Sequence, residues 1–283
     1  MIYILLDESW YFDIGSAGSS TLVLQTVVPI LWFSPTPVKV AVRGGTHNPL
    51  SPSFDFFQRS FCPLLPIQVN CRLEKFGFYP EGGGRVVADI PFPEKRTQTP
   101  FSLLNRGDFL SKNGLALIAE GKNLKDVEKI KEETHSTLSA FQKYLELEEK
   151  IESKILDNVQ CKKGGIKVFE SIIEYKNVCE IISMYPDPKK VPNETIAKQC
   201  AEEALNYIKN SDAPVDEHLA DQLLLPLVLI NGGEFRAVSI SSNSEHFLTN
   251  ASIIEQFFGK KCVEFKKLDD GSFHVIVLPG LKI

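Results

Sequence analysis

The sequence lacks the patterns that mark membrane-spanning and secreted proteins. Even the apolar segment from Thr21 to Phe33 falls short of the run of about 18 apolar residues that a helix needs to cross a bilayer. The amino-terminal residues have no basic region ahead of the apolar ones and no small-residue cleavage pattern, which argues against a secretory signal. We therefore expect no membrane partner and a cytoplasmic protein, or a nucleoplasmic one in a eukaryote.

Several binding signatures are also missing. The six cysteines are widely spread, with no CxxC pair and no histidine at a zinc-binding spacing, so reduced and mostly buried thiols are expected. No glycine-rich segment reads GxxxxGK[ST], or GxGxxG after a strand, which disfavours a P-loop or Rossmann site. The net charge of −5 argues against a large basic surface along a duplex, so a nucleic-acid partner would be held locally, for example at its end.

The first part of the chain alternates predicted helices and strands. Small polar residues from Gly15 to Ser20 lead into an apolar helix over 21–28, which we expect to be buried on nearly all sides, and its start can present amides to an anion. The elements predicted next are a strand over 38–42, a helix capped by Ser53 and running to about Leu65, and a positive-φ turn at 82–84 before a strand over 85–90.

The composition changes near Asn105, after which Lys and Glu dominate residues 122–163, typical of a solvated helical face. Here we predict a helix through Val127 to Phe141, strands over 166–168 and 172–175, and a helix capped by Asn193. The predicted domains are therefore an inserted small domain, 106–210, and a large catalytic domain made of 1–105 and 211–283.

The last part returns to the character of the first. We predict a helix over 217–229, a strand over 235–240, a helix near 252–258, and closing strands. Gln25 and Pro29 have the same spacing in one apolar helix as Gln222 and Pro226 in another, and a strand follows each, which hints at an internal repeat. The predicted fold class is α/β (α+β), with a repeated module split by the inserted domain.

His246 is the most suggestive of the five histidines. It lies between a predicted strand and a predicted helix, where ligands usually meet α/β sheets. An imidazole there can attack a phosphorus atom if a partner holds one nitrogen protonated and the other is free. An ordinary loop histidine bonded to backbone is the simpler interpretation of the spacing alone.

Asp221 and Gln222 fall in the first turns of a predicted helix, beside His218. A carboxylate and a carboxamide at this place can orient an imidazole or bind a purine edge or a ribose. The simpler interpretation is that acidic residues stabilise the helix N-terminus and that Gln222 satisfies buried backbone groups. Without further information the simpler interpretation is favoured.

Taken together, five motifs resemble the RNA 3′-terminal phosphate cyclase family, and they occur in the family's order. They are GSAGSSTLVLQTVVP (15–29), RGGTHNPLSP (43–52), GFYPEGGG (77–84), EHLADQLLLP (217–226) and HFLTN (246–250). The resemblance runs from about Phe12 to the carboxyl terminus and is weak in the insert. It implies modules of two helices on a four-stranded sheet, interrupted by a smaller α/β domain.

Members of that family transfer AMP from ATP to a histidine, pass it to an RNA 3′-phosphate, and release it when the neighbouring 2′-hydroxyl closes a 2′,3′-cyclic phosphate. Adenylation is needed because a phosphate oxygen is a poor leaving group. The resemblance implies ATP, with Mg²⁺ or Mn²⁺, as cofactors and RNA 3′ ends as partners. It gives His246 the role of nucleophile, with Asp221 near the imidazole. The adenylate pocket would be lined by Gln25, Pro52, His218, Asp221 and Gln222.

The same resemblance keeps an alternative open. Family members carry a further module before the GSAGS motif, and nothing similar precedes Tyr11, so we expect an N-terminally truncated member. One branch of the family lacks the histidine and acts in ribosomal RNA maturation. Retention of His246 with Asp221 and Gln222 favours the enzyme, whereas the missing module favours a catalytically inactive protein that binds RNA. An enolpyruvyl transferase on a similar repeated fold ranks low, because such enzymes lack the HFLTN motif.

Overall fold

Three mixed β-sheets carry the fold in a computed structural model, which describes residues 2–5, 9–65, 67–92, 99–119, 127–156, 164–186, 191–240 and 245–281. The first sheet has the strand order β1-β2-β3-β5-β4. Its strands are β1 (Ile2–Leu5), β2 (Ser9–Asp13), β3 (Val38–Gly44), β4 (Asn70–Lys75) and β5 (Gly84–Ile90). The expected four-stranded sheet is therefore extended by β1, which pairs antiparallel with β2.

Helices α1 (Ser20–Leu31) and α2 (Phe54–Phe56) belong to this first module. Ser19 and Ser53 cap them, each accepting a hydrogen bond from a backbone amide three residues ahead. The short α2 continues without a break as a π-helical turn, η1 (Phe57–Phe61), and a 3₁₀ turn, η2 (Cys62–Leu64), so the helix predicted from Ser53 is present with a changed pitch.

A second module repeats the first. It consists of β6 (Phe101–Leu103), α5 (Glu217–Leu229), β11 (Gly233–Ala237), α6 (His246–Phe258), β12 (Val263–Lys267) and β13 (Phe273–Val277). Its sheet order, β12-β13-β11-β6, matches β4-β5-β3-β2. Among these described strands only the last pair in each order, β11 with β6 and β3 with β2, is parallel. The internal repeat indicated by the two Gln–Pro segments is therefore present in the topology, with those segments on α1 and α5.

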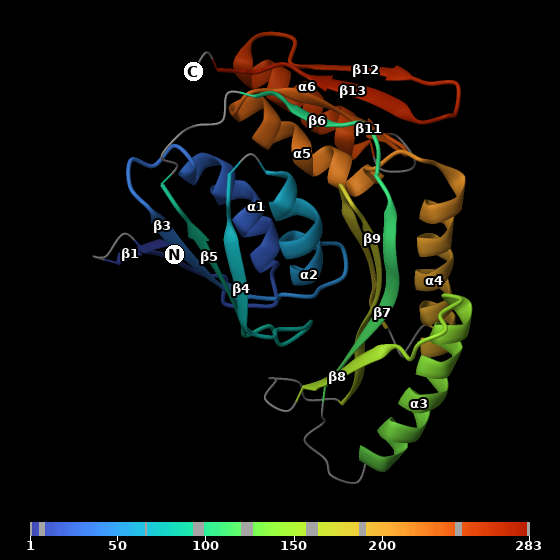
Figure 1. Ribbon diagram of the computed structural model, residues 1–283. Coiled ribbons are helices and arrows are strands. Elements are labelled where there is room, and N and C mark those ends of the chain that lie inside the picture. Colours follow the sequence, from blue (N-terminus) through green and yellow to red (C-terminus); the bar gives the residue numbers. More distant parts are fainter. Residues whose placement is uncertain are drawn as a thin grey trace.

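The insert leaves the second module between β6 and α5. Its sheet has the order β10-β9-β7-β8. Its elements are β7 (Phe109–Ala119), α3 (Val127–Tyr144), β8 (Glu152–Leu156), β9 (Gly165–Tyr175), β10 (Cys179–Met184) and α4 (Asn193–Asn210). In Figure 1, α3 and α4 cover one side of β7 and β9. The two modules, which together are called the body below, lie on the other side.

Alternation along β9 assigns its side chains to these two faces. Phe169 and Ile173 pack in the core beneath α3 and α4, whereas Val168 and Ile172 join the core of the body. Glu170 lies on the same face of β9 as Val168 and Ile172. A charged side chain is therefore carried into the interface between insert and body, where it is fully buried.

The body is layered. Helix α1 packs on β3 and β5 and also contacts α5, which packs on β11 and β13 of the second sheet. Figure 1 shows α1 and α5 between the two sheets of the body. The first helices of the two modules thus meet face to face at the centre of the molecule.

Several local expectations need correction. Helix α1 is not buried all round, because Leu22 and Ile30 are 45% and 58% exposed on its outer side. The two short strands predicted between Ile166 and Tyr175 are one strand, β9, because the polar residues between them have places on its two faces: Glu170 faces the body, and the Ser171 hydroxyl donates to the Cys200 carbonyl on α4. Asn193 is the first residue of α4 and does not cap it; Pro192 holds the cap position.

Two other expectations, for the glycine turn and for the cysteines, are confirmed. Gly82 and Gly83 have φ values of 64° and 73°, so the turn before β5 does need glycine. The five cysteines within the described residues are free and buried or half-buried, while Cys161 lies outside those residues. Within the described ranges, no helix is both long and apolar enough to span a membrane.

Candidate functional site

The six residues predicted for the site lie on three packed helices and one adjoining loop. Gln25 is on α1, Pro52 lies just before α2, and His246 begins α6. His218, Asp221 and Gln222 are on the first half of α5. Because α5 contacts both α1 and α6, the fold gathers these residues along one line of helix contacts.

Gln25 and Gln222 touch directly. The Gln25 Nε2 amide donates to Gln222 Oε1 in a short hydrogen bond. The two side chains hold equivalent places in the repeated modules, so the repeat itself creates the pair. Gln25 Oε1 and Gln222 Nε2 have no protein partner among the described residues, and both side chains are half-buried. One acceptor and one donor therefore remain side by side for a polar ligand.

Pro52 is tied to the start of α1. The Thr21 hydroxyl donates to the Pro52 carbonyl at 2.8 Å, and Thr21 stands one turn before Gln25 on the same helix. Ser53 then caps α2. The end of the loop that carries Pro52 is thus held at two adjacent residues, which places Pro52 beside the start of α1.

His246 and Asp221 are linked through a residue that the sequence reasoning did not single out. Asn250, one turn after His246 on α6, donates its side-chain amide to Asp221 Oδ1 at 2.8 Å and to the Asp221 carbonyl at 3.1 Å. No hydrogen bond joins Asp221 to the His246 ring among the described residues. Asp221 thus holds the helix that carries His246, and the HFLTN motif itself was the signal for Asn250.

His246 is exposed at the N-terminus of α6, and its ring has no hydrogen-bond partner within the described residues. The preceding residue, Glu245, has φ 48° and provides no side-chain cap. Within the described residues no side chain caps the first amides of the helix, and the positive end of the helix dipole favours an anionic group at this place. Ser244, which precedes Glu245, lies outside the described residues.

The start of α5 is capped by a half-buried carboxylate. Asp216 Oδ1 accepts from the Leu219 amide at 2.7 Å, and burial raises the pKa of Asp216. His218 follows with a 69% exposed side chain, its Nε2 4.0 Å from Glu217 Oε1. The acidic residue that caps the helix is therefore Asp216, which leaves the carboxylate of Asp221 free for the contact with Asn250.

Three amides of the loop from Gly15 to Ser20, which was expected to present amides to an anion, have partners within the protein. The Gly15 and Gly18 amides donate to the side chains of Asp13 and Ser16, and the Ser20 amide donates to the Gly45 carbonyl at 2.8 Å. These bonds use the amides to hold the loop against the strand end at Gly45.

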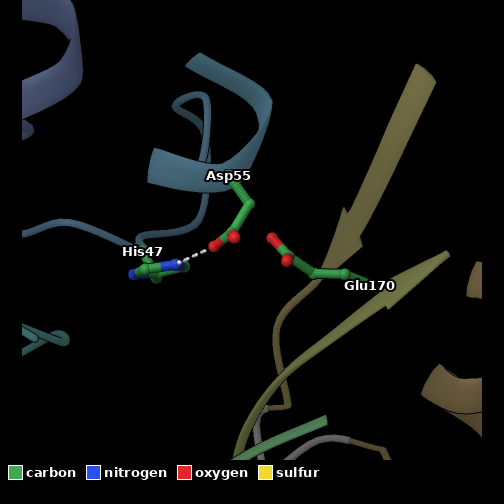
Figure 2. Close-up of side chains that lie close together, drawn as sticks. All are labelled: His47, Asp55 and Glu170. Carbon is green, nitrogen blue, oxygen red and sulfur yellow. Dashed lines mark hydrogen bonds and ion pairs between the residues drawn. The ribbon is translucent and has the colours of Figure 1, made fainter. Parts of the chain in front are cut away.

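A second cluster was missed entirely. His47, Asp55 and Glu170 turn their polar ends toward one another, with His47 Nε2 2.9 Å from Asp55 Oδ2 (Figure 2). Burial, followed by the charge of Asp55, raises the pKa of Glu170 to about 7. The signal in the sequence was Glu170 itself, a carboxylate between the apolar Val168 and Ile172 on one face of the strand.

The sequence matches the family model described as RNA 3′-terminal phosphate cyclase over residues 4–263. Three similar proteins carry the name RNA 3′-terminal phosphate cyclase. One from Ralstonia nicotianae is 35% identical over 87% of this chain and 67% of its own length, and one from Koribacter versatilis is 35% identical over 87% and 65%. One from Salmonella enteritidis is 38% identical over 87% and 68%. The chain spans about two thirds of the length of these relatives.

Proposed function

The chain belongs to the RNA 3′-terminal phosphate cyclase family, and on that basis we propose that it converts an RNA 3′-phosphate to a 2′,3′-cyclic phosphodiester at the expense of ATP. His246 is the nucleophile of the proposed reaction. The observation that carries this role is its position: an exposed imidazole on the uncapped N-terminus of α6, on a helix that Asn250 holds to Asp221.

The proposed reaction has three steps. A ring nitrogen of His246 attacks the α-phosphorus of ATP, and pyrophosphate leaves. An oxygen of the RNA 3′-phosphate then attacks the same phosphorus, and the bond to the histidine breaks. The 2′-hydroxyl finally attacks the 3′-phosphorus, loses its proton, and displaces AMP. The covalent step supplies the good leaving group that a bare phosphate lacks.

The helix geometry suits the first step. Phosphate oxygens beside His246 would meet the free amides and the positive dipole end of α6, which stabilise the charge that builds up as pyrophosphate leaves. Asp221 acts as a positioning residue through Asn250, because its carboxylate fixes the turn of α6 that follows the nucleophile. Mg²⁺ or Mn²⁺ would offset the charge of the triphosphate, and no residue of this chain is assigned as its ligand.

The glutamine pair suits the adenine. The free Gln25 Oε1 and Gln222 Nε2 supply one acceptor and one donor, the same complement that the Watson–Crick edge of adenine needs for its N6 and N1 atoms. Pro52 and the exposed His218 would border the same pocket. In this arrangement the base is bound by α1 and α5 and the phosphates by α6.

The test is covalent labelling. The purified chain is incubated with ATP labelled at the α-phosphate and with Mg²⁺, and protein-bound AMP is measured after denaturing electrophoresis. We expect an acid-labile labelled band that His246→Ala abolishes. A matched control is His135→Ala, because His135 is an exposed histidine on α3 of the insert and its replacement should leave labelling unchanged.

A 3′-phosphorylated RNA oligonucleotide is then added to the labelled protein. The label should leave His246, and the RNA end should become resistant to phosphatase. Labelling that persists in His246→Ala would assign the nucleophile elsewhere. An unlabelled but folded wild-type chain would overturn the proposal and favour a protein that binds RNA without modifying it.

A further inference from the structure

We propose that His47, Asp55 and Glu170 form a binding site for a divalent transition-metal ion between the body and the insert. His47 lies in the loop between β3 and α2, Asp55 lies on α2, and Glu170 lies on β9 of the insert. Their ligand atoms, one from each side chain, all lie within 4.8 Å of one another. None of the six residues of the proposed cyclase site belongs to this cluster.

The first observation behind the site is a buried oxygen without a partner. Glu170 is fully buried, and Ser183 on β10 donates to its Oε1 at 2.8 Å. Its Oε2 makes no hydrogen bond to any of the described residues. Figure 2 shows the carboxylate directed at Asp55 and His47. An oxygen buried in this way is unfavourable unless a proton or a cation meets it.

The second observation is the way in which His47 is held. Its ring is fully buried, stacked on Phe76 at a centroid distance of 5.4 Å, and Nδ1 lies 2.8 Å from Thr46 Oγ1. Thr46 Oγ1 also accepts from the Gly77 amide at 3.1 Å and lies 3.2 Å from the Gly77 carbonyl, so Thr46 is itself held in place. The ring is thus oriented through Nδ1, and Nε2 is directed at Asp55. A hydrogen-bond partner on the second ring nitrogen that orients the imidazole is typical of metal-binding histidines.

Charge and ligand type indicate which ion fits. Metal ligands bind deprotonated, so two carboxylates and an imidazole around an ion would bring two negative charges to it, and no Lys or Arg forms an ion pair with Asp55 or Glu170 within the described residues. A divalent cation would neutralise the set. The nitrogen ligand favours first-row transition metals such as Zn²⁺ or Mn²⁺ over Ca²⁺, and three protein ligands leave a position for water.

The distances are close to those needed. Metal–ligand bonds of about 2.0–2.2 Å place ligand atoms about 3.4 Å apart around a tetrahedral ion, so the widest of the three separations, all of which lie within 4.8 Å, closes by at most about 1.4 Å when an ion binds. Asp55 can make this movement, since its side chain is 23% exposed and also provides the entry path. The bound ion would join the insert to the body at the centre of their interface.

Mn²⁺ is the suitable probe, because it binds carboxylate and imidazole ligands but has little affinity for the neighbouring thiols of Cys62 and Cys71, whose sulfur atoms lie 3.7 Å apart. The full chain is treated with a chelator, desalted, and titrated with Mn²⁺ in the absence of nucleotide. Free Mn²⁺ is measured from its electron paramagnetic resonance signal. We expect one ion bound per chain.

Two variants test the ligands. Glu170→Gln and Asp55→Asn preserve side-chain shape while removing one negative charge, and each should weaken Mn²⁺ binding at least about tenfold. Glu174→Gln is the matched control. It lies on the same strand and interface, where its carboxylate already has Arg59 and Ser111 as partners, and it should bind as the wild type does.

Thermal unfolding gives an independent readout. Mn²⁺ should raise the melting temperature of the wild type and of Glu174→Gln, and should leave that of Glu170→Gln unchanged. The proposal is overturned if folded wild-type protein binds no stoichiometric ion, or if Glu170→Gln and Asp55→Asn both bind it with wild-type affinity.

Discussion

Arg106 is expected to hold the insert to the body, and its removal should destabilise the protein strongly. The side chain is 4% exposed and stands where the chain enters the insert. Its Nε donates to the Ala213 carbonyl at 2.8 Å and its Nη2 to the Tyr207 carbonyl at 2.7 Å, both where the chain returns. The guanidinium also lies 3.8 Å from the centroid of the Tyr207 ring. One cation thus binds both ends of the insert.

The expected loss in Arg106→Ala follows from these contacts. Each hydrogen bond to a charged group contributes about 1.5–3 kcal/mol, and a desolvated cation–π contact about 2 kcal/mol. Release of the buried charge to water offsets part of this sum, so the net loss in unfolding free energy should be about 3–5 kcal/mol. In a chain of this size that corresponds to a drop of about 10 °C in melting temperature.

Urea unfolding followed by far-ultraviolet circular dichroism measures the change. Arg85→Ala is the control, because Arg85 is 51% exposed and has a single ion pair, with Glu74, whose loss should change the unfolding free energy by less than about 1 kcal/mol. Arg106→Lys should fall between wild type and Arg106→Ala, since an ammonium cannot stack on a ring and reach both carbonyls as a guanidinium does. An Arg106→Ala variant within about 1 kcal/mol of the wild type would refute the reasoning.

Three further outcomes are expected. Glu180 is buried with Oε2 unpartnered among the described residues, and burial raises its pKa well above the usual value, so the folded state favours the neutral acid. Ionised Glu180 destabilises the folded state, so stability falls as the pH rises above the pKa that Glu180 has in the unfolded chain. Glu180→Gln should therefore raise the melting temperature at pH 8 but not near pH 4. An equal rise at both pH values would contradict this. Leu223→Ala, at a buried position of α5, should lower the unfolding free energy by about 2–5 kcal/mol. Leu22→Ala, on the exposed side of α1, should lower it by less than about 1 kcal/mol. Urea titrations measure both changes, and similar losses in the two variants would contradict the burial argument. Asn250→Ala should slow AMP labelling of the chain while changing its melting temperature little, and labelling at the wild-type rate would remove Asn250 from the positioning role.

The elements that the sequence predicts well are those with local causes. A helix begins after Ser53 because the Ser53 side chain accepts a hydrogen bond from the backbone amide of Phe56. The apolar spacing from Glu217 to Leu229 likewise predicts a helix from local sequence alone. The exposed side of α1 was not predictable from its composition, because Leu22 and Ile30 are apolar and only the packing of the body decides which side faces solvent.

The candidate site also contains both local relations, which the sequence predicts, and long-range contacts, which it does not. His246 and Asn250 share one helix, so their relation follows from local spacing. The Gln25–Gln222 contact joins residues 197 apart in the sequence, and only the repeat gave a hint of it. Nothing local connects His47 and Asp55 to Glu170, because that meeting depends on how the insert docks on the body.

The parallel pairing of β6 with β11 has a consequence for the order in which the protein forms. The hydroxyl of Ser102 donates to the Glu234 carboxylate across 132 residues of sequence. During synthesis β6 therefore leaves the ribosome long before its partner exists. Closing so long a flexible loop costs about 4 kcal/mol in chain entropy. If the insert folds first, it brings its own two ends together at Arg106 and Ala213, and most of that closure is already made when β11 emerges.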